Sequence, residues 1–129
     1  MRRRKEDLLS SFRHALEGLG YVLQVERNAR IHLAMAILVI IASAYLGISP
    51  TEWALIMIAI ALVFVGEMLN TVVELTIDLI MPENNPLAKH VKDVAAGAIL
   101  VAAIVAAVIG FLLLGPPLWL KIGTLFRWT

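Results

Sequence analysis

Three apolar runs without a charged residue, 33–46, 53–66 and 94–114, constrain the fold of this chain more than any other feature. A helix needs roughly 20 predominantly apolar residues to cross the hydrocarbon core of a bilayer. Hydrophobic residues make up 60% of the 129 positions, and the mean hydropathy is +0.87. Soluble domains average only about 45 to 50% apolar residues. The runs therefore predict a single-domain integral membrane protein.

The polar segments between these runs divide the chain into helices. Apolar residues recur at three- and four-residue spacing from Leu8 to Val25, which predicts an amphipathic helix lying in the membrane interface. The run Gly115-Pro116-Pro117 predicts the end of the last helix. We therefore expect an all-α membrane protein with an interfacial helix at 5–25, transmembrane helices at 30–47, 52–80 and 92–114, and a tail at 115–129.

Glycine, serine and proline mark two local features. The pair Gly18 and Gly20 is a candidate for a bend or break in the amphipathic helix. In the 47–52 turn, Gly47 suits a helix C-cap, and Ser49 or Thr51 suits the N-cap of the next helix around Pro50. This turn is therefore expected to connect two antiparallel helices directly.

Lysine and arginine are unevenly distributed along the chain. Seven lie at or before Arg30, two in the 82–92 loop and two after residue 115, whereas the 47–52 turn has none. The positive-inside rule then places the N-terminus and the 82–92 loop of this multi-pass protein in the cytoplasm. The net charge of +1 gives no basis for binding nucleic acid. The absence of cysteine excludes disulfides and cysteine nucleophiles.

Polar side chains form one stripe on the second transmembrane helix. With 100° of rotation per residue, the five residues of the stripe fall within about 100° of one another; they are Glu67, Asn70, Thr71, Glu74 and Asp78. Ionisable groups at membrane depth are costly and generally face a bundle interior or a wet cavity. The stripe therefore predicts a functional site.

Further charged residues gather at the cytoplasmic boundary in this topology. They are Glu26 before the first transmembrane helix, Glu74 and Asp78 on the second, Glu83 in the loop, and Lys92 and Asp93 at the start of the third. Carboxylates suit Mg²⁺, which completes its shell with waters and substrate phosphates, and a lysine provides a positive charge for phosphate oxygens. Along the helix axis, Glu67 lies about 10 Å deeper in the membrane than Glu74, at the depth of a lipid headgroup. These groups are the ingredients that phosphoryl transfer needs, but the motifs of soluble kinases are missing, so the pattern alone does not predict a kinase.

Two long motifs resemble the prokaryotic diacylglycerol kinase family. They are Glu67-Met-Leu-Asn70-Thr-Val-Val-Glu74-Leu-Thr-Ile-Asp78 and Ala88-Lys-His-Val-Lys92-Asp93-Val-Ala-Ala-Gly97. The segments 11–18 and 26–32 are similar to the N-terminal portion of the family in the form typical of its undecaprenol kinase branch. The resemblance covers about residues 10 to 112.

This resemblance implies a homotrimeric kinase of the bacterial inner (plasma) membrane whose active sites are shared between neighbouring subunits. Such an enzyme uses ATP and Mg²⁺ to phosphorylate a lipid alcohol, either undecaprenol or diacylglycerol. By position, the resemblance implies Glu67 as the catalytic base with Asn70 beside it, Glu26 and Glu74 as metal ligands, and Lys92, Asp93, Glu83, Asn84, Asn85 and His14 as ATP contacts. It implies Asn28, Arg30, His32 and Glu67 as substrate contacts. Asp78, near the end of its helix, is either a site residue, a solvated side chain or a partner of Lys89 or Lys92.

Two other classes of function are compatible with a polar stripe in a membrane helix. A small proton or cation transporter subunit would use Glu67, Glu74 and Asp78 as a relay. A relay should continue across the bilayer, however, and neither 53–66 nor 94–114 contains an ionisable residue. A structural assembly protein would instead tolerate Glu67→Gln. The sequence favours the lipid kinase.

Overall fold

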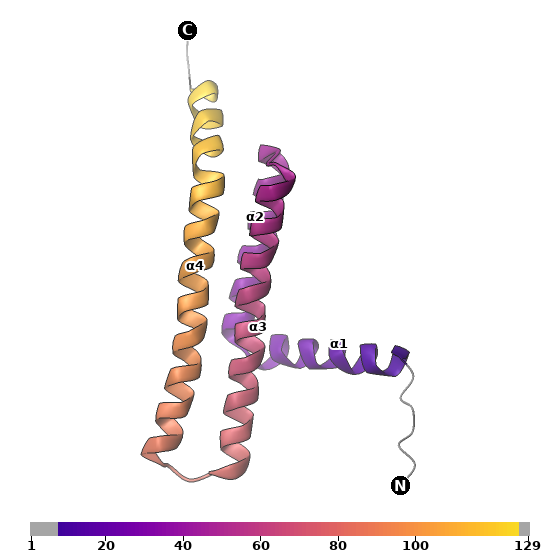
Figure 1. Ribbon diagram of the computed structural model, residues 1–129, viewed down its shortest axis with the longest axis vertical. Coiled ribbons are helices and arrows are strands. Elements are labelled where there is room, and N and C mark those ends of the chain that lie inside the picture. Colours follow the sequence, from indigo (N-terminus) through magenta and orange to yellow (C-terminus); the bar gives the residue numbers. More distant parts are fainter. Residues whose placement is uncertain (1–7, 127–129) are drawn as a thin grey trace.

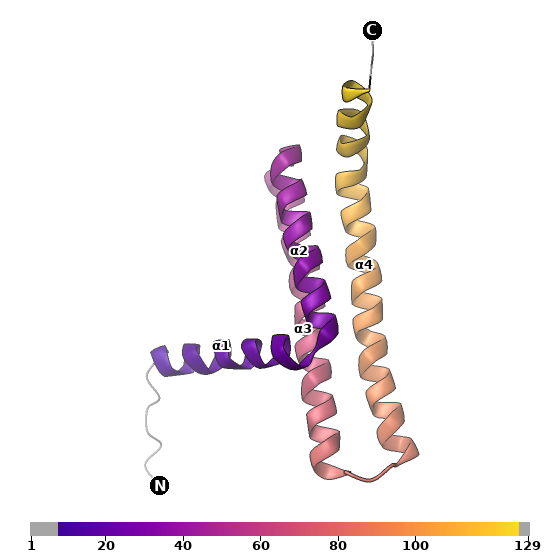
Figure 2. The same cartoon turned by 180° about the vertical axis from the view of Figure 1, so that it is seen from behind.

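The structure, a computed structural model, describes residues 8–126 and contains four α-helices in that range. They are α1 (Leu8–Val25), α2 (Arg27–Leu46), α3 (Pro50–Ile80) and α4 (Pro86–Leu125). Helices α2, α3 and α4 run alongside one another, whereas α1 projects sideways from them (Figures 1 and 2). All three bundled helices are long and apolar enough to cross a membrane. The predicted all-α class with three spans and one additional amphipathic helix is confirmed.

Helix α1 has the amphipathic character that its sequence predicts. Its first turns leave Leu8, Leu9, Phe12 and Leu16 more than half exposed, and Val22 is its only buried residue. The helix continues without a break through Gly18 and Gly20. Residues 5–7 of the predicted helix lie outside the described part of the chain. The exposed apolar side chains of α1 are suited to contact lipid at the membrane interface.

The corner between α1 and α2 is held by Arg30. The last carbonyls of a helix have no partner within it, and the Arg30 guanidinium donates to two of them in α1, Leu23 O at 3.2 Å and Gln24 O at 2.9 Å. Glu26 occupies the N-cap position of α2 but makes no capping hydrogen bond with its side chain. The Glu26 carboxylate is therefore not needed to start α2.

The turn between α2 and α3 has the predicted caps. Gly47 adopts φ +66°, in the left-handed region that glycine tolerates best, and its N–H donates to Ser43 O. The Ser49 hydroxyl accepts from the Glu52 N–H, and the Glu52 carboxylate accepts from the Ser49 N–H at 2.7 Å. This reciprocal capping box starts α3 with Pro50 in its first turn.

Helix α4 begins earlier than position 92, where the sequence predicts it to begin. It starts at Pro86, and the Asn85 side chain accepts from the N–H groups of Leu87 and Ala88. Proline is well tolerated at the first helical position, because the N–H that it lacks would have no partner within the helix there. Pro86, the second proline after α3, therefore starts the helix, whereas the predicted start at 92 leaves it in the loop.

Helix α4 also continues beyond residue 114, so the prediction of a separate tail at 115–129 is wrong. The helix passes through Pro116 and Pro117 and ends at Leu125. Ending a helix inside the membrane would leave many backbone groups without partners, whereas a proline removes only its own N–H and disturbs one turn. Trp119 therefore lies on α4, and Arg127 and Trp128 lie outside the described residues.

Lys121 connects the C-terminal part of α4 to the C-terminal end of α2. Its ammonium group donates to Tyr45 O at 2.7 Å and lies 4.1 Å from the centroid of the Tyr45 ring. The most extensive helix packing is between α3 and α4, where Gly66 lies against Ile99.

Candidate functional site

The polar stripe of α3 becomes more exposed towards the loop. Glu67, Asn70 and Thr71 are buried, at 1%, 6% and 3% exposure, Glu74 is half-buried and Asp78 is exposed. The Thr71 hydroxyl donates to the Glu67 carbonyl in the preceding turn, and Asn70 Nδ2 donates to Glu74 Oε1 at 2.9 Å. The stripe therefore runs from a nearly inaccessible carboxylate to one whose side chain is 62% exposed.

Glu67 meets a histidine from the neighbouring helix. His32 Nε2 on α2 lies 3.2 Å from Glu67 Oε1, and the His32 side chain is 25% exposed. Despite this short distance, Glu67 Oε1 accepts no hydrogen bond of regular geometry from the described residues, and neither does Asn70 Oδ1. Buried polar atoms are nearly always hydrogen-bonded, so these two oxygens mark a place where a ligand is expected to donate.

Two further carboxylates belong to the surroundings of Glu67. Glu26 at the start of α2 and Glu74 on α3 are close enough for their charges to act on Glu67, and both are half-buried. Among residues 8–126 no group of three or more histidine or acidic side chains is close enough to enclose a metal ion. Mg²⁺ commonly binds through only one or two protein carboxylates. Glu26 and Glu74 therefore fit the donor set that this ion requires.

A second polar cluster lies between the ends of α3 and α4. Lys92 Nζ donates to Asp78 Oδ1 at 2.5 Å across the hairpin, and Lys89 Nζ donates to Asp93 Oδ2 at 2.6 Å. These pairs lie beside a hollow of about 310 Å³, whose polar lining comprises Asp78, Glu83, Asn84, Asn85, Lys89, Lys92 and Asp93. Five of the six residues expected to contact ATP therefore come together, and Asp78 has the partner Lys92.

The structure separates other predicted residues from this hollow or gives them different contacts. His14 lies on exposed α1 and does not line the hollow. The Asn85 side chain caps α4, and Arg30 binds the carbonyls of α1, so both have local structural contacts. Asn28 is exposed near the start of α2. Lys89 also lines the hollow, although it was predicted only as a possible partner of Asp78. It pairs instead with Asp93, at the four-residue spacing that favours a helical ion pair.

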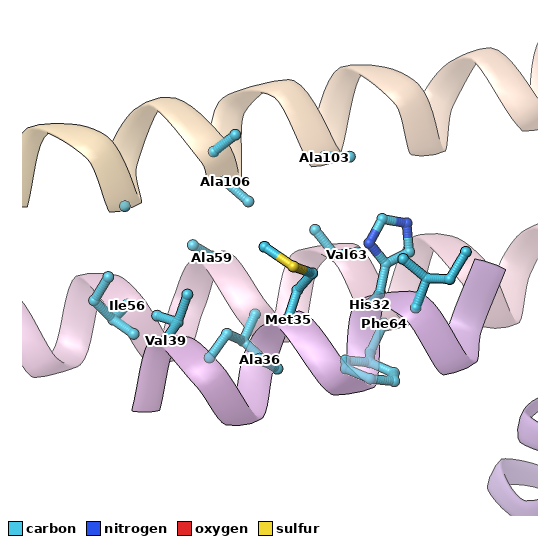
Figure 3. Close-up of a pocket in the computed structure, with 14 residues that line it drawn as sticks. His32, Met35, Ala36, Val39, Ile56, Ala59, Val63, Phe64, Ala103 and Ala106 are labelled. Atoms are coloured by element: carbon cyan, nitrogen blue, oxygen red, sulfur yellow. The ribbon is translucent and has the colours of Figure 1, made fainter. Parts of the chain in front are cut away.

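An apolar groove of about 280 Å³ lies between α2, α3 and α4. Figure 3 shows Ala103 and Ala106 of α4 on one side and Met35 and Val63 on the other. His32 is the one polar residue in the lining and lies towards one end of the groove. Through His32, the groove reaches the buried carboxylate of Glu67.

These features define a helical membrane protein with a buried carboxylate beside an apolar groove and a charged hairpin. The family model for prokaryotic diacylglycerol kinase matches residues 13–114. The chain belongs to this family.

Individual relatives are similar over most of the chain. An undecaprenol kinase from Bacillus subtilis is 42% identical over 108 residues, which are 84% of this chain and 88% of that protein. A diacylglycerol kinase from Synechocystis is 42% identical over 113 residues, 87% of this chain and 65% of that protein. A diacylglycerol kinase from Escherichia coli is 27% identical over 112 residues, 81% of this chain and 92% of that protein. No solved structure has a significant match.

Proposed function

We propose that this chain is a lipid kinase that transfers the γ-phosphoryl group of ATP to the hydroxyl of a membrane lipid alcohol. The observation that carries the proposal is Glu67, a carboxylate with 1% exposure whose Oε1 lacks a regular hydrogen bond and lies beside His32. The relatives named undecaprenol kinase and diacylglycerol kinase support this class of reaction.

The depth of the site supports a membrane-resident acceptor. Helix α1 leaves the bundle near the start of α2, and α3 and α4 continue beyond it to the 81–85 loop (Figure 1). If α1 lies in the membrane interface, the hairpin projects into the cytoplasm, and the N-terminus lies on the same side of the inner membrane. Glu67 is then roughly 16 Å along α3 from Asp78, near the level where a lipid hydroxyl lies.

In the proposed reaction, Glu67 accepts the proton of the lipid hydroxyl as its oxygen attacks the γ-phosphorus. The new P–O bond forms as the bond to the β-phosphate oxygen breaks, so the products are the lipid phosphate and ADP. His32 orients the Glu67 carboxylate, and Asn70 lies beside it on the same face of α3, where its Nδ2 donates to Glu74. A general base of this kind typically contributes 10²- to 10⁴-fold, about 3 to 5 kcal/mol of barrier.

The remaining polar and charged residues of the site are assigned to the binding of ATP. Lys92 exchanges Asp78 for phosphate oxygens, and Asp93, Glu83, Asn84 and Asn85 surround the rest of ATP in the hollow of the hairpin, with His14 approaching from α1. Mg²⁺, held by Glu26 and Glu74, would neutralise the phosphate oxygens between the two parts of the site. Asn28 and Arg30 flank the lipid side.

We also propose that the chain forms a homotrimer with sites shared between subunits. The hairpin that projects beyond α1 carries apolar side chains that are more than half exposed, Val72, Leu79, Leu87 and Val94. In the cytoplasm these side chains would be surrounded by water, and apolar patches of that kind are usually covered by a protein partner. Copies of the same chain would cover them and bring a neighbouring hairpin towards Glu67. The mass of the protein in detergent, corrected for bound detergent, tests this assembly.

The lipid alcohol is undecaprenol or diacylglycerol, and the form of segments 11–18 and 26–32 favours undecaprenol. The experiment is an assay with γ-labelled ATP on purified protein in mixed micelles, with each alcohol, with and without Mg²⁺. We expect Mg²⁺-dependent labelling of undecaprenol above that of diacylglycerol. Failure to label either alcohol would contradict the lipid kinase proposal.

A further inference from the structure

We propose that the apolar groove between α2, α3 and α4 binds one hydrocarbon chain of the lipid alcohol, and that Ala103 and Ala106 set the thickness of chain it accepts. The inference rests on the proposed lipid kinase function and adds a chain-binding subsite to it. The hydroxyl end of the lipid would lie at His32 and Glu67, and the chain would extend along the groove towards Gly110.

The polarity of the groove matches a lipid alcohol. Thirteen of its 14 lining residues are apolar, and the exception, His32, lies 3.2 Å from Glu67. Glu67 Oε1 is buried without a regular hydrogen bond, so a hydroxyl arriving at this end would supply a missing donor. A molecule that fits the whole feature is polar at one end and hydrocarbon along the rest.

The size of the groove favours a single chain. A cavity of 150 Å³ lined by apolar side chains holds benzene, so the groove of about 280 Å³ has room for roughly ten to twelve carbon atoms. One turn of a helix with its side chains occupies roughly 400 Å³ or more, given a diameter of about 10 to 12 Å. The groove is therefore too small to enclose a helical turn of a second copy but accommodates the first part of one lipid chain.

The wall formed by α4 leaves this space open. Ala103, Ala106, Ala107 and Gly110 present only methyl groups or hydrogen atoms to the groove, opposite larger side chains of α2 and α3 such as Met35 (Figure 3). A leucine at position 106 would place three additional carbon atoms in the groove. Filling a packed space in this way excludes the ligand or forces neighbouring side chains apart.

Ala106→Leu tests the proposal, and Ala44→Leu, the same change at an exposed position of α2 on the helix face opposite Met35 and outside the groove, is the matched control. We expect Ala106→Leu to raise the KM for a long-chain polyprenol at least tenfold and Ala44→Leu to change it less than twofold. The KM for ATP and the oligomer mass should remain unchanged in both. A five-carbon prenol, whose chain ends before Ala106, should be phosphorylated equally by wild type and Ala106→Leu.

Labelling of the wild-type protein gives a second measurement that does not depend on turnover. A polyprenol with a diazirine about ten carbons from the hydroxyl should label the 103–110 segment of α4, and excess unlabelled polyprenol should prevent this labelling. An unchanged KM for polyprenol in Ala106→Leu would overturn the inference. So would an altered oligomer mass in this variant, because it would assign the groove to a second copy. Neither result would contradict the proposed lipid kinase function. Absence of phosphoryl transfer in the wild type would instead contradict the proposed function.

Discussion

Replacing His32 by alanine should slow phosphoryl transfer with little effect on nucleotide binding. His32 Nε2 lies 3.2 Å from Glu67 Oε1, and the carboxylate is 1% exposed, so water cannot easily replace the imidazole. A hydrogen bond to a charged group contributes about 1.5 to 3 kcal/mol. His32 is 25% exposed and makes no hydrogen bond of regular geometry to Glu67, so its contribution should be at or below the bottom of that range, about 0.7 to 1.5 kcal/mol. Since about 1.4 kcal/mol is a factor of ten in rate, kcat should fall roughly 3- to 12-fold.

The assay is the initial rate of lipid phosphate formation in mixed micelles, with ATP and lipid alcohol varied separately. His32→Gln retains a side-chain donor and should recover part of the lost kcat. His90→Ala, at an exposed position near the start of α4, is the control and should remain within twofold of wild type. The reasoning would be refuted by a His32→Ala variant with wild-type kcat, or by a loss that appears only in the KM for ATP.

Three contacts outside the proposed chemistry give predictions for stability. Lys121→Met removes the hydrogen bond and the cation–π contact to Tyr45. It should lower the free energy of unfolding in detergent by about 1 to 2 kcal/mol. An unchanged free energy of unfolding would mean that this contact does not stabilise the end of α4. Ser49→Ala removes the capping box of α3 and should cost about 1 kcal/mol in the same measurement, whereas Ser49→Asp should restore it. Arg30→Gln weakens the contacts to the last carbonyls of α1 and should cost about 0.5 to 1.5 kcal/mol, which an Arg30→Lys variant should partly recover.

Much of the helical framework follows from local sequence patterns. The helical period alone places Glu67, Asn70 and Glu74 on one face of α3, and Gly47 with Ser49 marks the turn that the structure contains. These features depend on residues within a few positions of one another. Local rules failed at Pro116 and Pro117, because they describe helices in water and α4 continues through both.

Contacts between distant segments were not accessible to sequence reasoning. The approach of His32 to Glu67 depends on how α2 packs against α3, and the contact of Lys121 with Tyr45 joins positions 76 residues apart. Composition and periodicity carry no information on the relative shift of two helices along their axes. The groove between α2, α3 and α4 could not be predicted for the same reason, since its space arises from that shift and from the small residues of α4.

The central claim is tested most directly by the rate of phosphoryl transfer to the lipid alcohol in Glu67→Gln. The matched control is Glu17→Gln, the same change in an exposed side chain of α1 that pairs only with Arg13 among the described residues. A general base contributes about 10²- to 10⁴-fold, so Glu67→Gln should lose at least 10²-fold in kcat while Glu17→Gln remains close to wild type. Transfer by Glu67→Gln at the wild-type rate would contradict the account.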